Sequence, residues 1–134
     1  MSLPVVSWPR VTAAVFLGEA VPIVVLVAVV AVFGPRDPVG AGDFAQKAGL
    51  WVGPLAGAGV VLLLSAWAGR GSSRPILQGA GIGLTVALLD LGILAVTGAP
   101  FAAVFVASNV GKVLAGTLGG WLSRERQTNP KRAP

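Results

Sequence analysis

The stretch from Val11 to Phe33, VTAAVFLGEAVPIVVLVAVVAVF, decides the fold class of this chain. It is apolar apart from Thr12 and Glu19, and it exceeds the roughly 20 residues that an α-helix needs to cross the hydrocarbon core of a bilayer. Three further apolar stretches of similar length follow, at about residues 49–68, 76–97 and 101–122. The sequence therefore predicts an all-α integral membrane protein, a bundle of four transmembrane helices over about 11–33, 49–68, 76–97 and 101–122.

Composition supports lipid as the solvent of this chain. Of its 134 residues, 54% are hydrophobic and only 11% are charged, and the mean hydropathy is +0.82. A soluble domain carries about 25% charged residues, because its surface faces water. We expect one transmembrane domain over residues 1–122 and a flexible, basic cytoplasmic tail over 123–134. The polar segment GPRDPVGAGDFAQK, which begins at Gly34, is predicted to be a loop.

Basic residues gather on one side of the predicted membrane. The N-terminal segment, the second connection and the tail carry seven of them: Arg10, Arg70, Arg74, Arg124, Arg126, Lys131 and Arg132. The first connection carries only Arg36 and Lys47, balanced by two aspartates. The positive-inside rule then places both termini in the cytoplasm, as in a multi-pass protein of the inner cell membrane. The net charge of +5 indicates anionic lipid headgroups as partners of the tail rather than nucleic acid.

Three ionisable residues lie inside the predicted spans: Glu19, Asp90 and Lys112. Each costs roughly 2.5–3.5 kcal/mol at a helix centre and therefore needs a partner or a purpose. Counted from the tight turn between the last two helices, Asp90 and Lys112 differ by about 7 Å in depth, and their side chains lean toward each other. The sequence predicts that they pair, with Asn109 on the same face. Glu19 is then left without a cation, and a buried carboxyl of that kind favours its protonated form.

Two further features concern the shape and packing of the helices. Pro22 removes the N–H that would bond the carbonyl of Gly18, which predicts a kink in the first helix beside Glu19. In the fourth helix, Gly111, Ala115 and Gly119 recur every four residues and form a stripe that lets helix backbones approach closely. Such a stripe serves either packing within one protomer or self-association.

The chain has no Cys and no His, which excludes thiolate nucleophiles, His-based triads and Cys/His metal sites. We expect no enzyme, no cofactor and no metal. The leading hypothesis is a proton-linked secondary transporter or channel-like permease that works as a homo-oligomer, with Glu19, Asp90, Asn109 and Lys112 as its polar site. The alternative is a non-catalytic accessory or assembly subunit of a larger membrane complex. The buried charges could equally form a structural pair that sets helix register.

Some features of the chain resemble known membrane families. Four short helices with a glutamate in the first resemble the plan of small multidrug-resistance transporters, but the lysine at position 112 departs from it. The stretches GLTVALLDLGILAVTGAP and FAAVFVASNVGKVLAGTLGGWLSR are similar in pattern to a hairpin of GtrA-like lipid-linked sugar translocases. Size and topology are similar to those of the accessory subunit I of ATP synthases. These likenesses imply transport or assembly in a membrane, and they assign the chain to no family.

Overall fold

The computed structural model describes residues 5–98 and 103–128. These residues form four helices: α1 Trp8–Phe33, α2 Pro38–Gly69, α3 Pro75–Thr97 and α4 Ala103–Thr128. All four are long and apolar enough to cross a membrane, and no strand occurs in the described ranges. The predicted all-α class is confirmed, with four helices that could span a membrane. The orientation of the bundle and its oligomeric state stay predictions.

Large apolar side chains cover the outside of the bundle. Phe16 is 72% exposed, Leu55 is 73% exposed and Val96 is 89% exposed. The buried core is small and consists of Ala14, Val61, Ala68, Ile82 and Val86. A protein dissolved in water rarely exposes large apolar side chains over an extended surface. The exposed faces are therefore suited to lipid.

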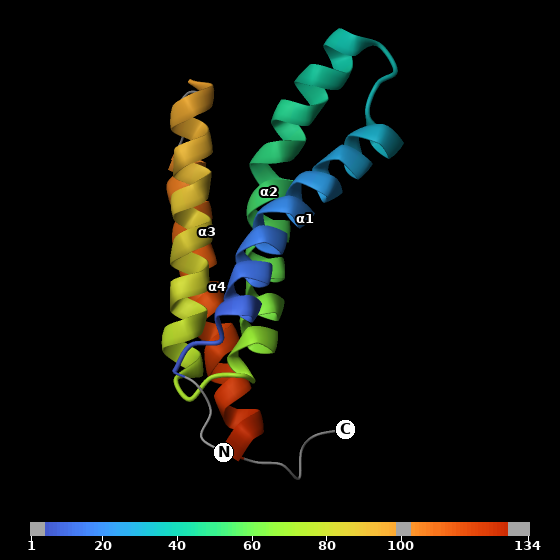
Figure 1. Ribbon diagram of the computed structural model, residues 1–134. Coiled ribbons are helices and arrows are strands. Elements are labelled where there is room, and N and C mark those ends of the chain that lie inside the picture. The colour runs from blue at the N-terminus through green and yellow to red at the C-terminus, as the bar shows by residue number, and fades with distance from the viewer. Residues whose placement is uncertain (1–4, 99–102, 129–134) are drawn as a thin grey trace.

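The helices form two antiparallel hairpins, α1–α2 and α3–α4, and α2 packs along α4 (Figure 1). The hairpins meet at the lower end in Figure 1 and diverge toward the upper end. The lower end, called the closed end below, holds Trp8, Gly69, Pro75 and Thr128. The upper end, called the open end, holds Phe33, Pro38, Thr97 and Ala103.

Side-chain hydrogen bonds fasten the closed end. The Gln78 carboxamide accepts from the backbone N–H of Ser7 and donates to the carbonyl of Ala68, both at 3.0 Å. Gln127 donates to the carbonyl of Gly69 at 3.1 Å. These bonds join all four helices or their immediate flanks. At the open end, the side-chain hydrogen bonds of the described residues are local to one helix or its cap, so nothing comparable ties the hairpins together there.

Glycines bring α3 and α4 into backbone contact. A Cβ built on Gly79 would collide with the carbonyl of Gly116, and one on Gly83 with the carbonyl of Lys112. These close approaches are typical of helix pairs in lipid, where small residues let backbones meet. The α3–α4 hairpin is therefore closely packed, and this packing fixes the height at which Lys112 faces α3.

The predicted stripe on α4, Gly111, Ala115 and Gly119, is buried at one end and open at the other. Ala115 is buried, and a Cβ on Gly119 would collide with the carbonyl of Leu62 in α2. Gly111 differs, because a Cβ there would meet nothing within 4 Å. Residues four apart rotate around a helix by about 40° per step, so the stripe turns from the outer surface of the protomer at Gly111 into its interior at Gly119.

The first connection is shorter than the sequence predicted. The helix α2 begins at Pro38, so most of the segment predicted as a loop is helical and that prediction was wrong. Asp37 caps the helix, with its carboxylate accepting from the N–H of Gly40 at 2.7 Å, and proline suits the first helical position. These start signals outweigh the glycines that follow. At about 1.5 Å per residue, α2 exceeds the roughly 30 Å hydrocarbon core, so it must tilt or project.

The fourth helix also ends later than predicted. It continues to Thr128, and therefore the first half of the segment predicted as a flexible tail is helical and held to α2 by Gln127. The rest of that tail, residues 129–134, and the predicted start of the fourth helix at Phe101 lie outside the described residues. The third helix ends at Thr97, followed by Gly98 with φ +65°, the left-handed geometry in which glycine commonly terminates a helix.

Candidate functional site

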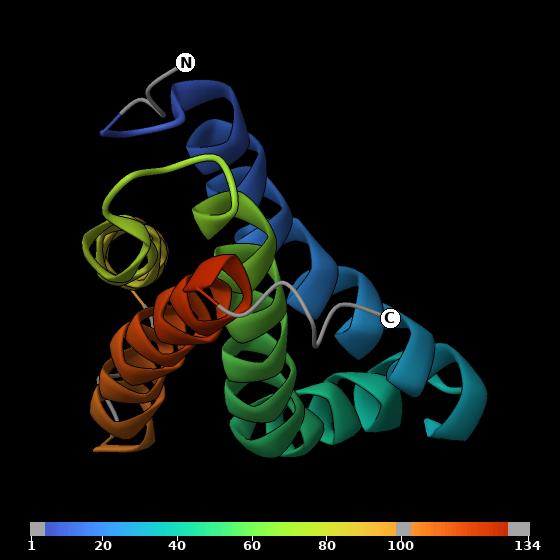
Figure 2. The ribbon, with the colours of Figure 1, turned by 90° about the horizontal axis from the view of Figure 1, so that it is seen from below.

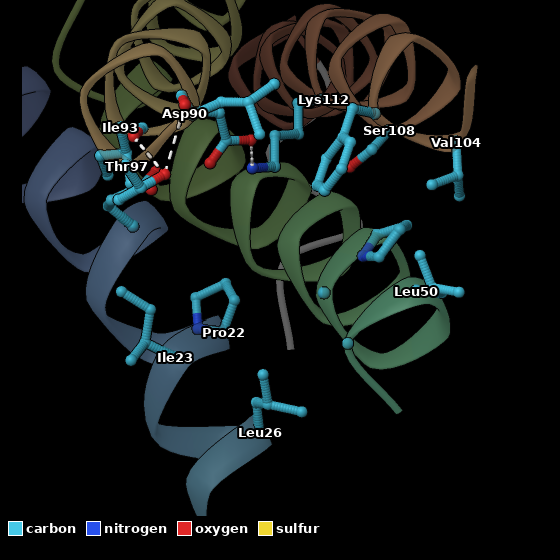
Figure 3. Close-up of a pocket in the computed structure, with 16 residues that line it drawn as sticks. Pro22, Ile23, Leu26, Leu50, Asp90, Ile93, Thr97, Val104, Ser108 and Lys112 are labelled. Atoms are coloured by element: carbon cyan, nitrogen blue, oxygen red, sulfur yellow. Dashed lines mark hydrogen bonds and ion pairs between the residues drawn. The ribbon is translucent and has the colours of Figure 1, made fainter. Parts of the chain in front are cut away.

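A cavity of about 220 Å³ lies where the two hairpins diverge; it is called the wedge cavity below (Figure 3). Its walls are mostly apolar and come from all four helices: Ile23 and Leu26 of α1, Leu50 of α2, Ile93 and Leu94 of α3, and Val104 and Phe105 of α4. Its polar lining includes Glu19, Asp90, Ser108 and Lys112. We call these four residues the polar floor.

The predicted pair of Asp90 and Lys112 is present. The Lys112 ammonium donates to Oδ2 of Asp90 across the α3–α4 hairpin (Figure 3). The Lys112 side chain is 6% exposed and that of Asp90 is 26% exposed. A buried charge in this setting depends on its partner, because either group alone would remain desolvated and uncompensated. The pair therefore ties the middle of α3 to that of α4.

Lys112 reaches its partner through space left by a glycine on a third helix. A Cβ on Gly57 of α2 would come within 2.8 Å of the Lys112 Cε and 3.9 Å of the Pro22 Cγ. The lysine stem thus passes between α4 and α2 at the level where α1 carries its proline. The sequence pattern places Gly57 in a GxxxG pair with Gly53, which indicates helix packing and gives no sign of this contact with Lys112.

Glu19 brings a third ionisable group to the same place from the other hairpin. It lines the wedge cavity with Asp90 and Lys112. Its Oε2 is buried and has no hydrogen-bond partner among the described residues, whereas the ammonium of Lys112 is bonded to Asp90. The polar floor accordingly holds two carboxyls and one ammonium.

Glu19 also lines a second cavity, of about 590 Å³, which we call the α1–α3 groove. This groove begins at Trp8, at the closed end, and runs past Val15 and Thr85 to Glu19 and Ile23. The wedge cavity extends the other way, to Thr97 at the open end. Glu19 is therefore shared by two cavities that reach toward opposite ends of the bundle.

Asn109 belongs to the predicted polar cluster but not to the wedge cavity. It is 9% exposed, and its Oδ1 lacks a hydrogen-bond partner among the described residues. The neighbouring Ser108 lines the cavity in its place. Consecutive residues point about 100° apart on a helix, which is why one residue lines the cavity and the next does not.

Two prolines mark the level at which the hairpins separate. Pro22 of α1 and Pro54 of α2 both lie inside their helices and both line the wedge cavity. Figure 2 shows α2 changing direction between its first part and the rest. One turn before Pro22, Gly18 packs closely, since a Cβ there would be 3.1 Å from Val86. The sequence shows Pro54 as a proline within an apolar span, but it does not indicate that Pro54 and Pro22 line one cavity.

Comparison with known proteins gives no family for the chain. No protein-family model matches it, and no curated protein or solved structure matches it significantly. Among the described residues, no group of three His, Cys, Asp or Glu side chains could hold a metal ion. The fold and the site thus define a class only: a bundle of four helices that could each span a membrane, with an ion pair and a second carboxyl inside it.

Proposed function

We propose that this protein is a small proton-linked secondary transporter or channel-like permease that works as a homo-oligomer. The observation that carries the proposal is the position of Glu19, which lines both the wedge cavity and the α1–α3 groove. A single ionisable side chain between two cavities can exchange a proton with water that enters either cavity. Ionisable residues inside membrane spans commonly mark such ion and proton pathways.

The charge inventory of the polar floor supports proton exchange at Glu19. Asp90 and Lys112 neutralise each other, so the charge of the floor follows the protonation of Glu19. A solute or ion that enters the wedge cavity therefore meets a floor that carries either no net charge or one negative charge. This difference couples occupancy of the cavity to binding of a proton.

The prolines support movement of the walls. Pro22 leaves the carbonyl of Gly18 without its helical donor, and Pro54 does the same for Leu50. Breaks of this kind near the membrane midplane are typical of transporter binding sites. In our proposal, the open halves of α1 and α2 move against the rigid α3–α4 hairpin and change the access to Glu19. The volume of 220 Å³ lies below the roughly 300–1,000 Å³ of drug-sized pockets, which favours a small solute or ion.

The test is proton flux in vesicles reconstituted with purified protein. Glu19→Gln keeps the shape and much of the hydrogen bonding of the side chain but cannot exchange a proton. It should leave expression and thermal stability within the range of the wild type while abolishing pH-dependent flux. Glu125→Gln is the matched control, because Glu125 is exposed near the end of α4 and should leave flux unchanged. The proposal would be contradicted if the wild type showed no proton-coupled flux with any member of a broad panel of cations and anions.

An accessory subunit of a larger membrane complex is the second candidate. The observation that favours it is a set of glycines outside the cavities, such as Gly59 and Gly111, at which a Cβ would meet nothing within 4 Å. These bare surfaces leave room for a helix of another chain. Purification in mild detergent separates the candidates: a lone, stable homo-oligomer supports the transporter, and stoichiometric capture of a larger partner supports the subunit.

A further inference from the structure

A third cavity lies at the closed end, away from the wedge cavity and its polar floor. It has a volume of about 490 Å³ and is lined by the start of α3, by the two residues before it and by Arg124 of α4. Its lining combines two arginines, Arg74 and Arg124, with the apolar side chains of Ile76, Leu77 and Ala80. We call it the arginine groove. None of its residues takes part in the proposed transport site.

The two arginines line one cavity from different parts of the chain, and neither has a counter-ion among the described residues. Arg74 precedes α3 and Arg124 lies in α4, and both are exposed. Neither forms a salt bridge among the described residues, where the bond of Lys112 to Asp90 is the one ion pair. Two like charges at one cavity repel each other, and an anion between them removes that repulsion. Guanidinium groups bind phosphate through two parallel hydrogen bonds, which makes a phosphate group the natural occupant.

The first turn of α3 adds backbone N–H donors for an anion to the arginine groove. No side chain caps this helix, and Pro75 occupies its first turn. The backbone N–H groups of Ile76 and Leu77 have no acceptor within the helix, and both residues line the arginine groove. The positive end of the α3 dipole lies there as well.

The apolar side of the groove indicates what carries the phosphate. Leu77 is 61% exposed and lies in the first turn of α3, next to Arg74, while Ala80 lies nearly one turn further along the helix. Trp121, 43% exposed, lies three residues before Arg124 in α4, and tryptophan side chains prefer the headgroup region of a bilayer. We propose that the arginine groove binds one anionic phospholipid, with its phosphate between Arg74 and Arg124 and an acyl chain along Leu77 and Ala80.

Lipid retention by the purified protein tests this site. The probe is phosphatidylglycerol, titrated in detergent and detected by native mass spectrometry, with phosphatidylcholine as the neutral comparison. The test variant is the double change Arg74→Gln with Arg124→Gln. The matched control is Arg70→Gln with Arg126→Gln. It removes the same charge from the same end of the bundle, but neither residue lines the arginine groove.

We expect wild type and control to retain one phosphatidylglycerol and the test variant to bind it at least about tenfold more weakly than the control. The double change Arg74→Lys with Arg124→Lys keeps both charges and should recover only part of the affinity, because lysine cannot form the paired hydrogen bonds. Thermal unfolding of each variant checks that it is folded.

Three results would overturn the proposal. Equal losses in the test and control variants would show a general electrostatic attraction of the basic end. Equal retention of phosphatidylcholine, whose phosphate is offset by the positive charge of its choline, would show that the groove has no preference for an anionic headgroup. Displacement of the lipid by inorganic phosphate at a comparable concentration would show a site for soluble phosphate, in which the apolar wall has no part.

Discussion

Lys112 depends on three helices other than its own. Asp90 of α3 accepts from its ammonium, Gly57 of α2 leaves room for its stem, and Pro22 of α1 lies at the same level. A lysine in the hydrocarbon core is tolerated only with such a partner and such space. The carboxyl of Glu19 lines the same cavity without an ion-pair partner among the described residues, because the ammonium of Lys112 is already bonded to Asp90.

A double-mutant cycle tests the ion pair at the residue scale. Lys112→Leu alone should lower the free energy of unfolding by about 3–5 kcal/mol, because it leaves Asp90 desolvated without a cation. Asp90→Leu alone should act similarly. The double change Asp90→Leu with Lys112→Leu should be milder than either single change. If the loss in the double variant equals the sum of the two single losses, measured by unfolding in detergent, the two residues do not interact.

At the scale of elements, the two hairpins differ in rigidity. The helices α3 and α4 touch through glycine backbones along their closed halves and are joined again at Asp90 and Lys112. In the other hairpin, both helices carry an interior proline. We therefore expect α3–α4 to act as the fixed part and the open halves of α1 and α2 as the part that moves.

Paired glycine variants on α3 test the fixed part. Gly83→Ala places a methyl group against the backbone of Lys112 and Val113, which cannot yield as a flexible side chain would. It should lower stability by about 1–3 kcal/mol, as overpacking does. Gly81→Ala, two residues away, adds a methyl where nothing lies within 4 Å and should be neutral or slightly stabilising, because alanine favours helix more than glycine. Equal melting temperatures for the two variants would contradict the packing described here.

At the scale of the whole molecule, the number of helices and the pairing of Asp90 with Lys112 could be predicted from the sequence. Both depend on local quantities: the apolar length of a span and the rise per residue on either side of a tight turn. The wedge cavity could not be predicted from the sequence, because it depends on the crossing of helices that are far apart in the chain. The roles of Gly57 and Pro54 were missed for the same reason. The early start of α2 was missed because a local cap at Asp37 outweighs a glycine-rich segment.

The orientation of the bundle leads to a labelling prediction. The chain lacks cysteine, so single cysteines can be introduced at the two ends of the bundle without background. A membrane-impermeant thiol reagent applied to intact cells should label Arg36→Cys, in the first connection, and should reach Ser73→Cys only after the membrane is opened. This pattern follows from the excess of basic residues at the closed end. Labelling of Ser73→Cys from outside would reverse the orientation.

The protonation of Glu19 itself is the most direct measurement of the central claim. Infrared difference spectra of the purified protein in lipid, recorded across pH, detect the carbonyl absorption of a protonated carboxyl. Our account predicts that the wild type shows a buried carboxyl that gains and loses its proton over the pH range in which flux changes. It further predicts that this signal is absent in Glu19→Gln and retained in Glu125→Gln. Spectra of the wild type and of Glu19→Gln that coincide at every pH would contradict the assignment of Glu19 as the proton-exchanging group.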